Sequence, residues 1–175
     1  MPTLDVLGPV GVESRLQALL EVAYGDVLDR RPYELRFREL RPGSKSSLAG
    51  LTVQGFAADH MDPPDIPLCL RITVPTSEGP RVIAFSGDTR LGEGLRQAAD
   101  GADLLIAECS GLAHPIGRHC AWEDWRGYLP ECTAKRVVLS HLGAAVRASR
   151  ERLVDELPPQ SPPVIFADDG LALTL

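Results

Sequence analysis

The sequence lacks the marks of membrane and exported proteins. No apolar run approaches the ~20 residues needed to cross a bilayer. Residues 1–16 have no basic segment followed by an apolar one, so they do not form a secretory signal. Only 4 cysteines occur, at irregular spacing and without a CxxC pair. Nothing therefore indicates a disulfide framework, and we expect a reduced, cytoplasmic protein with no membrane partner.

Positive charge is also scarce. Lys and Arg number 18 against 24 Asp and Glu, for a net charge of −6. The chain is therefore a poor general nucleic-acid binder, although this balance still allows a local basic patch. With 44% hydrophobic and 24% charged residues, the composition is that of a globular protein, which excludes intrinsic disorder. No internal repeat, low-complexity tract or long linker divides the 175 residues. We therefore expect one domain over residues 1–175.

The first half of the sequence predicts one helix and then several strands. Residues 11–24 have apolar residues at helical spacing, with Ser14 or Gly11 as the N-cap. Alternating or short apolar runs follow, separated by Pro-Gly and Gly-Pro turn signals. These runs predict strands over residues 33–40, 51–57, 68–74 and 81–85. We expect them to form an antiparallel meander.

The second half alternates strands and helices. Helical patterns cover residues 93–99, 122–129 and 147–156, and strand patterns cover residues 103–107, 135–140 and 164–167. Asp168-Asp169-Gly170 reads as a hairpin turn to a last strand over residues 171–175. This alternation predicts an α/β layer.

Residues of metal-ligand type follow three predicted strands. His60 comes after the strand that ends at Ala57, Asp88 follows VIAF, and His141 follows RVVL. Ligands of α/β layers gather at the carboxyl ends of strands, and imidazole with carboxylate suits Zn²⁺, Mn²⁺ or Fe²⁺. Each residue taken singly also fits a structural role, as a hydrogen-bonded histidine or a Gly-Asp turn.

Several longer phrases resemble the metallo-β-lactamase-fold hydrolases, above all their ribonuclease Z branch. The main one is VIAFSGDTRLGEGLRQAADGADLLIAECS; the others are LDVLGPVGVESRLQALLEVAY, ELRPG, AADHMDPPDIPLCLRI, RVVLSHLG and DDGLALTL. Matches in the family's order make an unrelated α/β domain with a coincidental SGDT a remote alternative. The resemblance implies an αββα sandwich, of which this chain holds mostly the C-terminal sheet and its helices.

The resemblance also implies site residues. His60 would bind one metal, Asp88 would bridge two metals, and His141 would bind the second, with zinc or manganese as the cofactor. A bridging carboxylate holds two cations roughly 3.5–4 Å apart, and the cations activate a water that attacks phosphorus. Glu108 and His119 match, less closely, a family pair in which the histidine donates a proton to the leaving oxygen.

Other readings remain open for several of these residues and their neighbours. His119 also fits the start of a helix on a wet surface, and His114 fits a loop histidine. Cys109 and Cys120 are either soft ligands or bystander thiols. Trp122 and Trp125, at helical spacing, fit a packing pair or a base-stacking platform.

The family's HxHxDH motif is absent from the 175 residues. The resemblance therefore implies only the later part of a domain, truncated at its N-terminus, with an apolar sheet face left open. We expect a homodimer, a partner chain that supplies the first half, or a chain shortened by a frameshift or start-site choice. We also expect weak metal occupancy or none in this chain alone.

Two functional hypotheses follow. The first is a metal-dependent phosphodiesterase of ribonuclease Z type, acting on a nucleic acid or a small phosphodiester. The second is an inactive remnant that serves as a subunit or interaction module.

Overall fold

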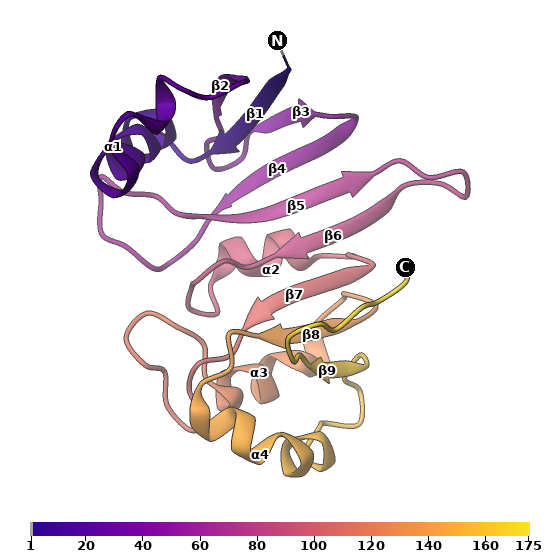
Figure 1. The fold of residues 1–175 in the computed structure, drawn as a ribbon. Helices are drawn as coiled ribbons and strands as arrows, with labels where there is room; N and C mark the ends of the chain where they lie inside the picture. Colours follow the sequence, from indigo (N-terminus) through magenta and orange to yellow (C-terminus); the bar gives the residue numbers. More distant parts are fainter. Residues whose placement is uncertain (1) are drawn as a thin grey trace.

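The computed structural model describes residues 2–175 and is built around a seven-stranded mixed sheet (Figure 1). Its strands lie in chain order: β3 (Lys45–Leu48), β4 (Leu51–Ala57), β5 (Leu68–Val74), β6 (Arg81–Phe85), β7 (Leu104–Glu108), β8 (Val137–Ser140) and β9 (Val164–Phe166). Neighbours from β3 to β6 pair antiparallel, and those from β6 to β9 pair parallel. The α/β layer is confirmed, as is the antiparallel meander for residues 51–57, 68–74 and 81–85, and β3 is an additional strand.

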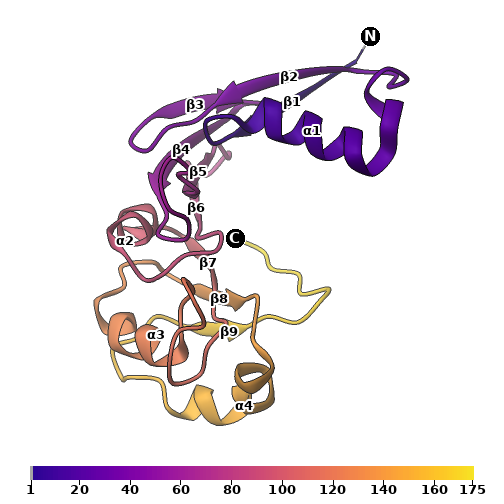
Figure 2. The ribbon, with the colours of Figure 1, turned by 90° about the vertical axis from the view of Figure 1, so that its left-hand side faces the viewer.

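Helices cover one face of this sheet. They are α2 (Glu93–Ala99), α3 (Trp122–Tyr128) with the short 3-10 helix η2 (Leu129–Glu131), and α4 (Ala144–Asp155). In the edge-on view of Figure 2, α2 and α3 lie on the side of the sheet opposite the C-terminal residues. Alternate strand residues such as Cys69, Ala84 and Leu105 meet Trp122 and Trp125 in a fully buried core. This layer of parallel strands and helices positions the strand ends described below.

Residues 3–39 form a small unit beside the large sheet. β1 (Thr3–Gly8), α1 (Val12–Tyr24), the 3-10 helix η1 (Gly25–Leu28) and β2 (Glu34–Glu39) make a two-stranded parallel sheet with its connecting helix. The expectation that residues 33–40 belong to the meander is therefore wrong. A hairpin turn would make β2 antiparallel to β1. Here α1 carries the chain back to the start of β1, so β2 runs parallel to it. Gly11 is the N-cap of α1, and α1 buries none of its residues.

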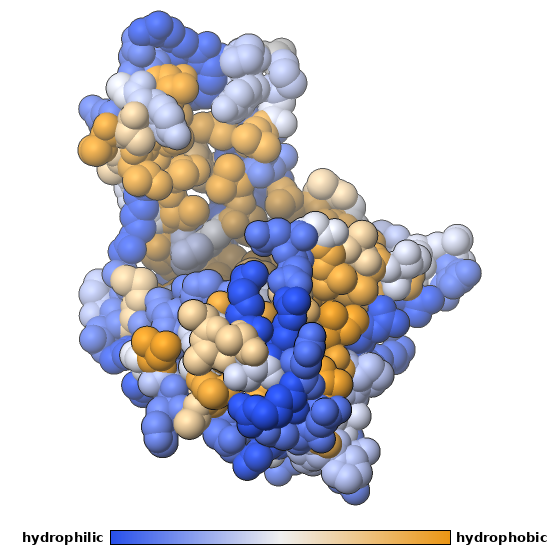
Figure 3. Space-filling model, turned by 60° about the horizontal axis from the view of Figure 1, so that its bottom comes forward, coloured by the Kyte–Doolittle hydropathy of each residue, from blue (hydrophilic) through white to orange (hydrophobic). Residues whose placement is uncertain are grey.

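The second face of the large sheet is apolar. The strand register places Ile72, Ile83, Leu104, Ile106 and Val138 side by side on it. Figure 3 shows a hollow lined by hydrophobic residues on this side of the molecule. Phe85 remains 42% exposed on this face, as the resemblance to a half-sandwich implies.

The closing hairpin is not formed. Leu171 N–H donates to the Asp168 carbonyl in a turn, but residues 171–175 pair with no strand. Instead Leu171, Leu173 and Leu175 line a cavity of about 560 Å³ together with residues of the open sheet face. Apolar contact with that face replaces strand pairing for these leucines. Among residues 2–175, no helix combines the length and apolarity needed to cross a membrane.

Candidate metal centre

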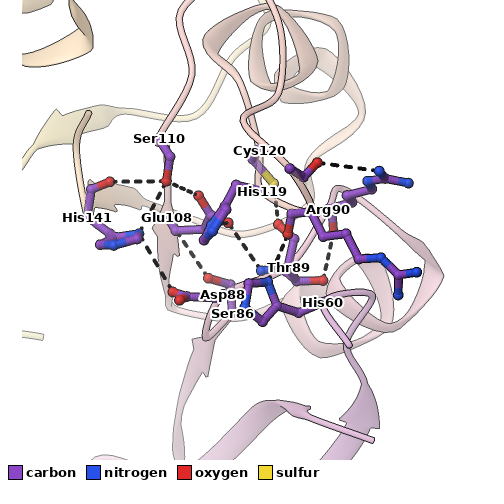
Figure 4. A network of polar contacts seen from close by, with 12 residues as sticks. His60, Ser86, Asp88, Thr89, Arg90, Glu108, Ser110, His119, Cys120 and His141 are labelled. Carbon is purple, nitrogen blue, oxygen red and sulfur yellow. Dashed lines mark hydrogen bonds and ion pairs between the residues drawn. The ribbon is translucent and has the colours of Figure 1, made fainter. Parts of the chain in front are cut away.

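The predicted site residues converge at one edge of the sheet. β6, β7 and β8 run parallel, and β4 runs in the same direction because two antiparallel pairings separate it from β6. The carboxyl ends of these four strands therefore lie together. His60, Asp88, Glu108 and His141 follow or end these strands, and His119 arrives from the loop before α3 (Figure 4). The structure thus brings all five residues together, while their roles stay predictions.

The three histidine rings lie in a row. The ring centroids of His60 and His119 are 4.8 Å apart, and those of His119 and His141 are 5.5 Å apart. Asp88 joins this row, with its Oδ1 3.6 Å from Nδ1 of His141. Two sets offer ligand atoms that all lie within 4.8 Å of one another: His60, Asp88 and His119, and Glu108, His119 and His141. Imidazole and carboxylate donors at this spacing suit a divalent cation such as Zn²⁺ or Mn²⁺.

Glu108 is buried beneath this row, with 2% of its side chain exposed. Its Oε1 accepts from Nδ1 of His119 at 2.7 Å and from the Thr89 N–H at 3.1 Å. Its Oε2 accepts from the Ser110 hydroxyl at 2.8 Å. These three donors compensate the burial of a carboxylate. The side chain is therefore fixed in place, with both oxygens already engaged.

Each imidazole is oriented through its Nδ1 atom. Nδ1 of His60 lies 3.0 Å from the Arg118 carbonyl oxygen, which only accepts, so this nitrogen carries the proton. His119 has the same arrangement with Glu108. Nδ1 of His141 lies 3.2 Å from the Ser110 hydroxyl. In His60 and His119 this leaves Nε2 available to a cation, as in metal-binding histidines.

The loops that carry His141 and Ser110 approach each other closely. A Cβ atom added to Gly143 would lie 1.9 Å from the Ser110 carbonyl oxygen. His141 itself has φ +48°, a left-handed conformation that costs a non-glycine residue about 1–2 kcal/mol. Strained residues of this kind cluster at functional sites. The tight turn aims the His141 ring back toward Asp88.

The open alternatives for the neighbouring residues are resolved by burial. Cys109 and Cys120 are fully buried and lie outside both ligand sets, so they are bystander thiols. Burial raises the pKa of Cys109 to about 12 and also raises that of Cys120. Trp122 and Trp125 are packing residues with at most 1% exposure, so a base-stacking platform is wrong.

The two loop histidines also differ in their surroundings. His114 is an exposed loop residue, as expected. His119 lies before the start of α3 and is 20% exposed. The helix-start alternative for His119 is therefore wrong.

Ser110 and Thr89 were not singled out from the sequence. Ser110 stands two residues after Glu108 in an extended segment, where alternation places both side chains on the same side. Its hydroxyl contacts Glu108 and His141. The signal that points to it is the polar residue two positions beyond a strand-ending glutamate.

Two curated proteins are similar to this chain in sequence. No family model matches the chain. A ribonuclease Z of Bacillus licheniformis is 31% identical over 140 residues, which are 76% of this chain and 41% of that protein. A ribonuclease Z of an Exiguobacterium is 29% identical over 101 residues, 54% of this chain and 33% of that protein. The chain thus spans well under half the length of these curated relatives.

Solved structures give the same result for the fold. The metallo-β-lactamase-fold protein YhfI from Bacillus subtilis superposes with a TM-score of 0.69 at 18% identity, covering 97% of this chain and 64% of that one. The chain has the metallo-β-lactamase fold and is related to ribonuclease Z. The short form of human tRNase Z superposes on this chain with a TM-score of 0.68 at 18% identity. The superposition covers 99% of this chain and 68% of the human protein. A diphosphatase of the PhnP family superposes with a TM-score of 0.72 at 14% identity, covering 100% of this chain and 60% of the diphosphatase. The family resemblance and the expected fold are both confirmed.

Proposed function

We propose that this chain is the later part of a metal-dependent hydrolase that cleaves phosphodiesters. The observation that carries the proposal is the convergence of His60, Asp88, His119 and His141 over the buried Glu108. In a complete two-cation site, His60 and His141 would each hold one cation, and Asp88 would be shared by both. Zinc or manganese suits this donor set. The substrate is a nucleic acid or a small phosphodiester, which the ribonuclease Z relatives support.

The residues of this chain divide the chemistry between them. Cations held by these residues would supply an activated water and neutralise charge on the phosphodiester oxygens. Glu108 accepts the Nδ1–H of His119 and fixes the ring with Nε2 toward the site. Nε2 then donates a proton to the leaving oxygen, a role that imidazole fills near neutral pH. Ser110 holds Glu108 and His141 in one hydrogen-bonded group.

The second candidate is an inactive subunit or interaction module. The missing HxHxDH motif favours it, as does the apolar sheet face. We propose that a second copy of the chain, or a partner chain that carries the missing ligands, covers this face. The free state of Cys69, Cys109, Cys120 and Cys132 supports a reducing compartment such as the cytoplasm.

A complementation assay tests the proposed function. The purified chain is mixed with the part of Bacillus licheniformis ribonuclease Z that the match leaves out, and hydrolysis of bis(p-nitrophenyl) phosphate and of RNA is followed with Zn²⁺ or Mn²⁺. We expect metal-dependent hydrolysis that is lost in Asp88→Asn and His141→Ala and kept in His114→Gln. Hydrolysis that His141→Ala leaves unchanged would refute the proposed mechanism. A stable complex without hydrolysis would support the inactive subunit.

A further inference from the structure

We propose that this chain on its own binds one divalent cation through His60, Asp88 and His119. The proposal shares His60 and Asp88 with the proposed function and rests on it to that extent. It adds His119, which the proposed function uses as a proton donor, as the third ligand. We expected weak occupancy because the three ligands His60, Asp88 and His141 belong to two different metals. The structure adds His119 as a fourth donor beside them.

The geometry of the three donors supports a single site. One ligand atom from each residue lies within 4.8 Å of the others. The residues come from three separate segments, after β4, after β6 and before α3. Two histidines and one carboxylate form a three-ligand set that leaves positions open for water. Asp88 has about half of its side chain exposed, and among residues 2–175 its one close polar partner is Nδ1 of His141 at 3.6 Å. Its carboxylate is therefore available to a cation.

The surroundings of the two imidazoles match those of metal ligands. Metal-binding histidines almost always donate their second N–H to a carboxylate or a backbone carbonyl. His119 has the buried Glu108 carboxylate at 2.7 Å, and His60 has the Arg118 carbonyl at 3.0 Å. Both rings are thus held with Nε2 free, and little rotation is left to be lost when a cation binds.

The second set, Glu108, His119 and His141, is the weaker candidate. Both oxygens of Glu108 already accept hydrogen bonds, from His119, Thr89 and Ser110. A cation on Glu108 would have to displace donors from a buried carboxylate, which costs their hydrogen bonds. His141 is also the most exposed of the three rings, with 57% of its side chain accessible.

This site has a consequence for activity. Nε2 of His119 cannot hold a cation and carry a proton at the same time. The chain alone therefore binds metal without cleaving a phosphodiester. Ligands from the missing part would draw the cations toward His60, Asp88 and His141 and release His119 to its proposed role as proton donor.

Zinc titration of the full chain tests the proposal. The chelator-treated protein is titrated with Zn²⁺ by calorimetry, and Co²⁺ is added in parallel to record its visible spectrum. We expect one ion per chain. His60→Gln, Asp88→Asn and His119→Gln should each weaken binding about tenfold or more, as should Glu108→Gln, which loosens His119. His114→Gln, the exposed loop histidine, is the matched control, and it and His141→Gln should leave the affinity within about threefold, well below the effect of losing an orienting group.

The outcomes separate this proposal from the proposed function. No binding, or binding that His141→Gln weakens and His119→Gln does not, overturns the single-site proposal. The second of these results leaves the ligand set of the proposed function standing. Near-ultraviolet circular dichroism of each metal-free variant checks that it is folded. A Co²⁺ spectrum that changes with His119→Gln identifies a lost ligand, because altered packing alone leaves the coordination sphere intact. Failure of the complementation assay bears on hydrolysis and leaves the zinc result unaffected.

Discussion

Gly143→Ala tests the close contact between the two loops that carry Ser110 and His141. Gly143 has φ −62° and ψ 156°, a conformation that alanine adopts without strain. The added Cβ, however, would lie 1.9 Å from the Ser110 carbonyl oxygen, where real Cβ contacts stay above 3.0 Å. The loops must therefore separate by at least about 1.1 Å. Overpacking of this kind costs about 1–3 kcal/mol.

Gly127→Ala is the matched control for this substitution. Gly127 is exposed in α3, and a Cβ there would meet no atom within 4 Å. Replacing it should raise the free energy of unfolding by about 0.5–1 kcal/mol, because glycine disfavours helix. Urea unfolding measures both variants. If Gly143→Ala is as stable as the unchanged chain, the close approach of the two loops is wrong, and with it the contact between Ser110 and His141.

Three further predictions concern the layers beneath the site. Trp125→Ala removes a fully buried ring and its N–H donated to the Glu108 carbonyl at 2.9 Å, so urea unfolding should show a loss of about 3–5 kcal/mol. Ser110→Ala leaves Oε2 of Glu108 without its donor and should lower stability by about 1–3 kcal/mol, with Ser110→Thr closer to the unchanged chain in thermal unfolding. Burial raises the pKa of Cys69 and Cys109 to about 12, so as pH rises the unfolded chain loses these protons first. Below the ordinary titration range of a thiol, the free energy of unfolding should not depend on these two groups. From that range up to about pH 12 it should fall, by up to about 1.4 kcal/mol per pH unit for each thiol. Urea unfolding at a series of pH values checks this, and a flat profile would contradict it.

The central strands and the site positions were predictable because each follows from a local pattern. Short apolar runs ended by polar residues marked β6, β7 and β8, and in a parallel layer such ends must meet at one edge. From the sequence alone, that rule predicts that Asp88 and His141 lie close together. His60 joined them only because an even number of antiparallel pairings separates β4 from β6.

The missed features depend on contacts that no local pattern records. The parallel pairing of β1 with β2 depends on where α1 returns the chain. Leu171, Leu173 and Leu175 alternate as a strand would, yet they lie over the open sheet face. Apolar residues at every second position indicate that one side of the segment is buried. The pattern does not show whether that segment pairs with a strand or packs on the face of a sheet. Ser110 was missed because its importance depends on His141, 31 residues away.

The small unit at the start of the chain has a consequence for how the molecule opens. None of residues 2–39 is buried, whereas Leu105, Val137 and Leu139 in β7 and β8 are fully enclosed. Segments with few buried contacts open with a free energy near zero, and core strands open only with the whole domain. The amide protons of α1 should therefore exchange with solvent through local fraying, and those of β7 and β8 only through global unfolding. The strand ends that carry the candidate site belong to the slowly exchanging part, so the site is kept in register even while the first unit opens and closes.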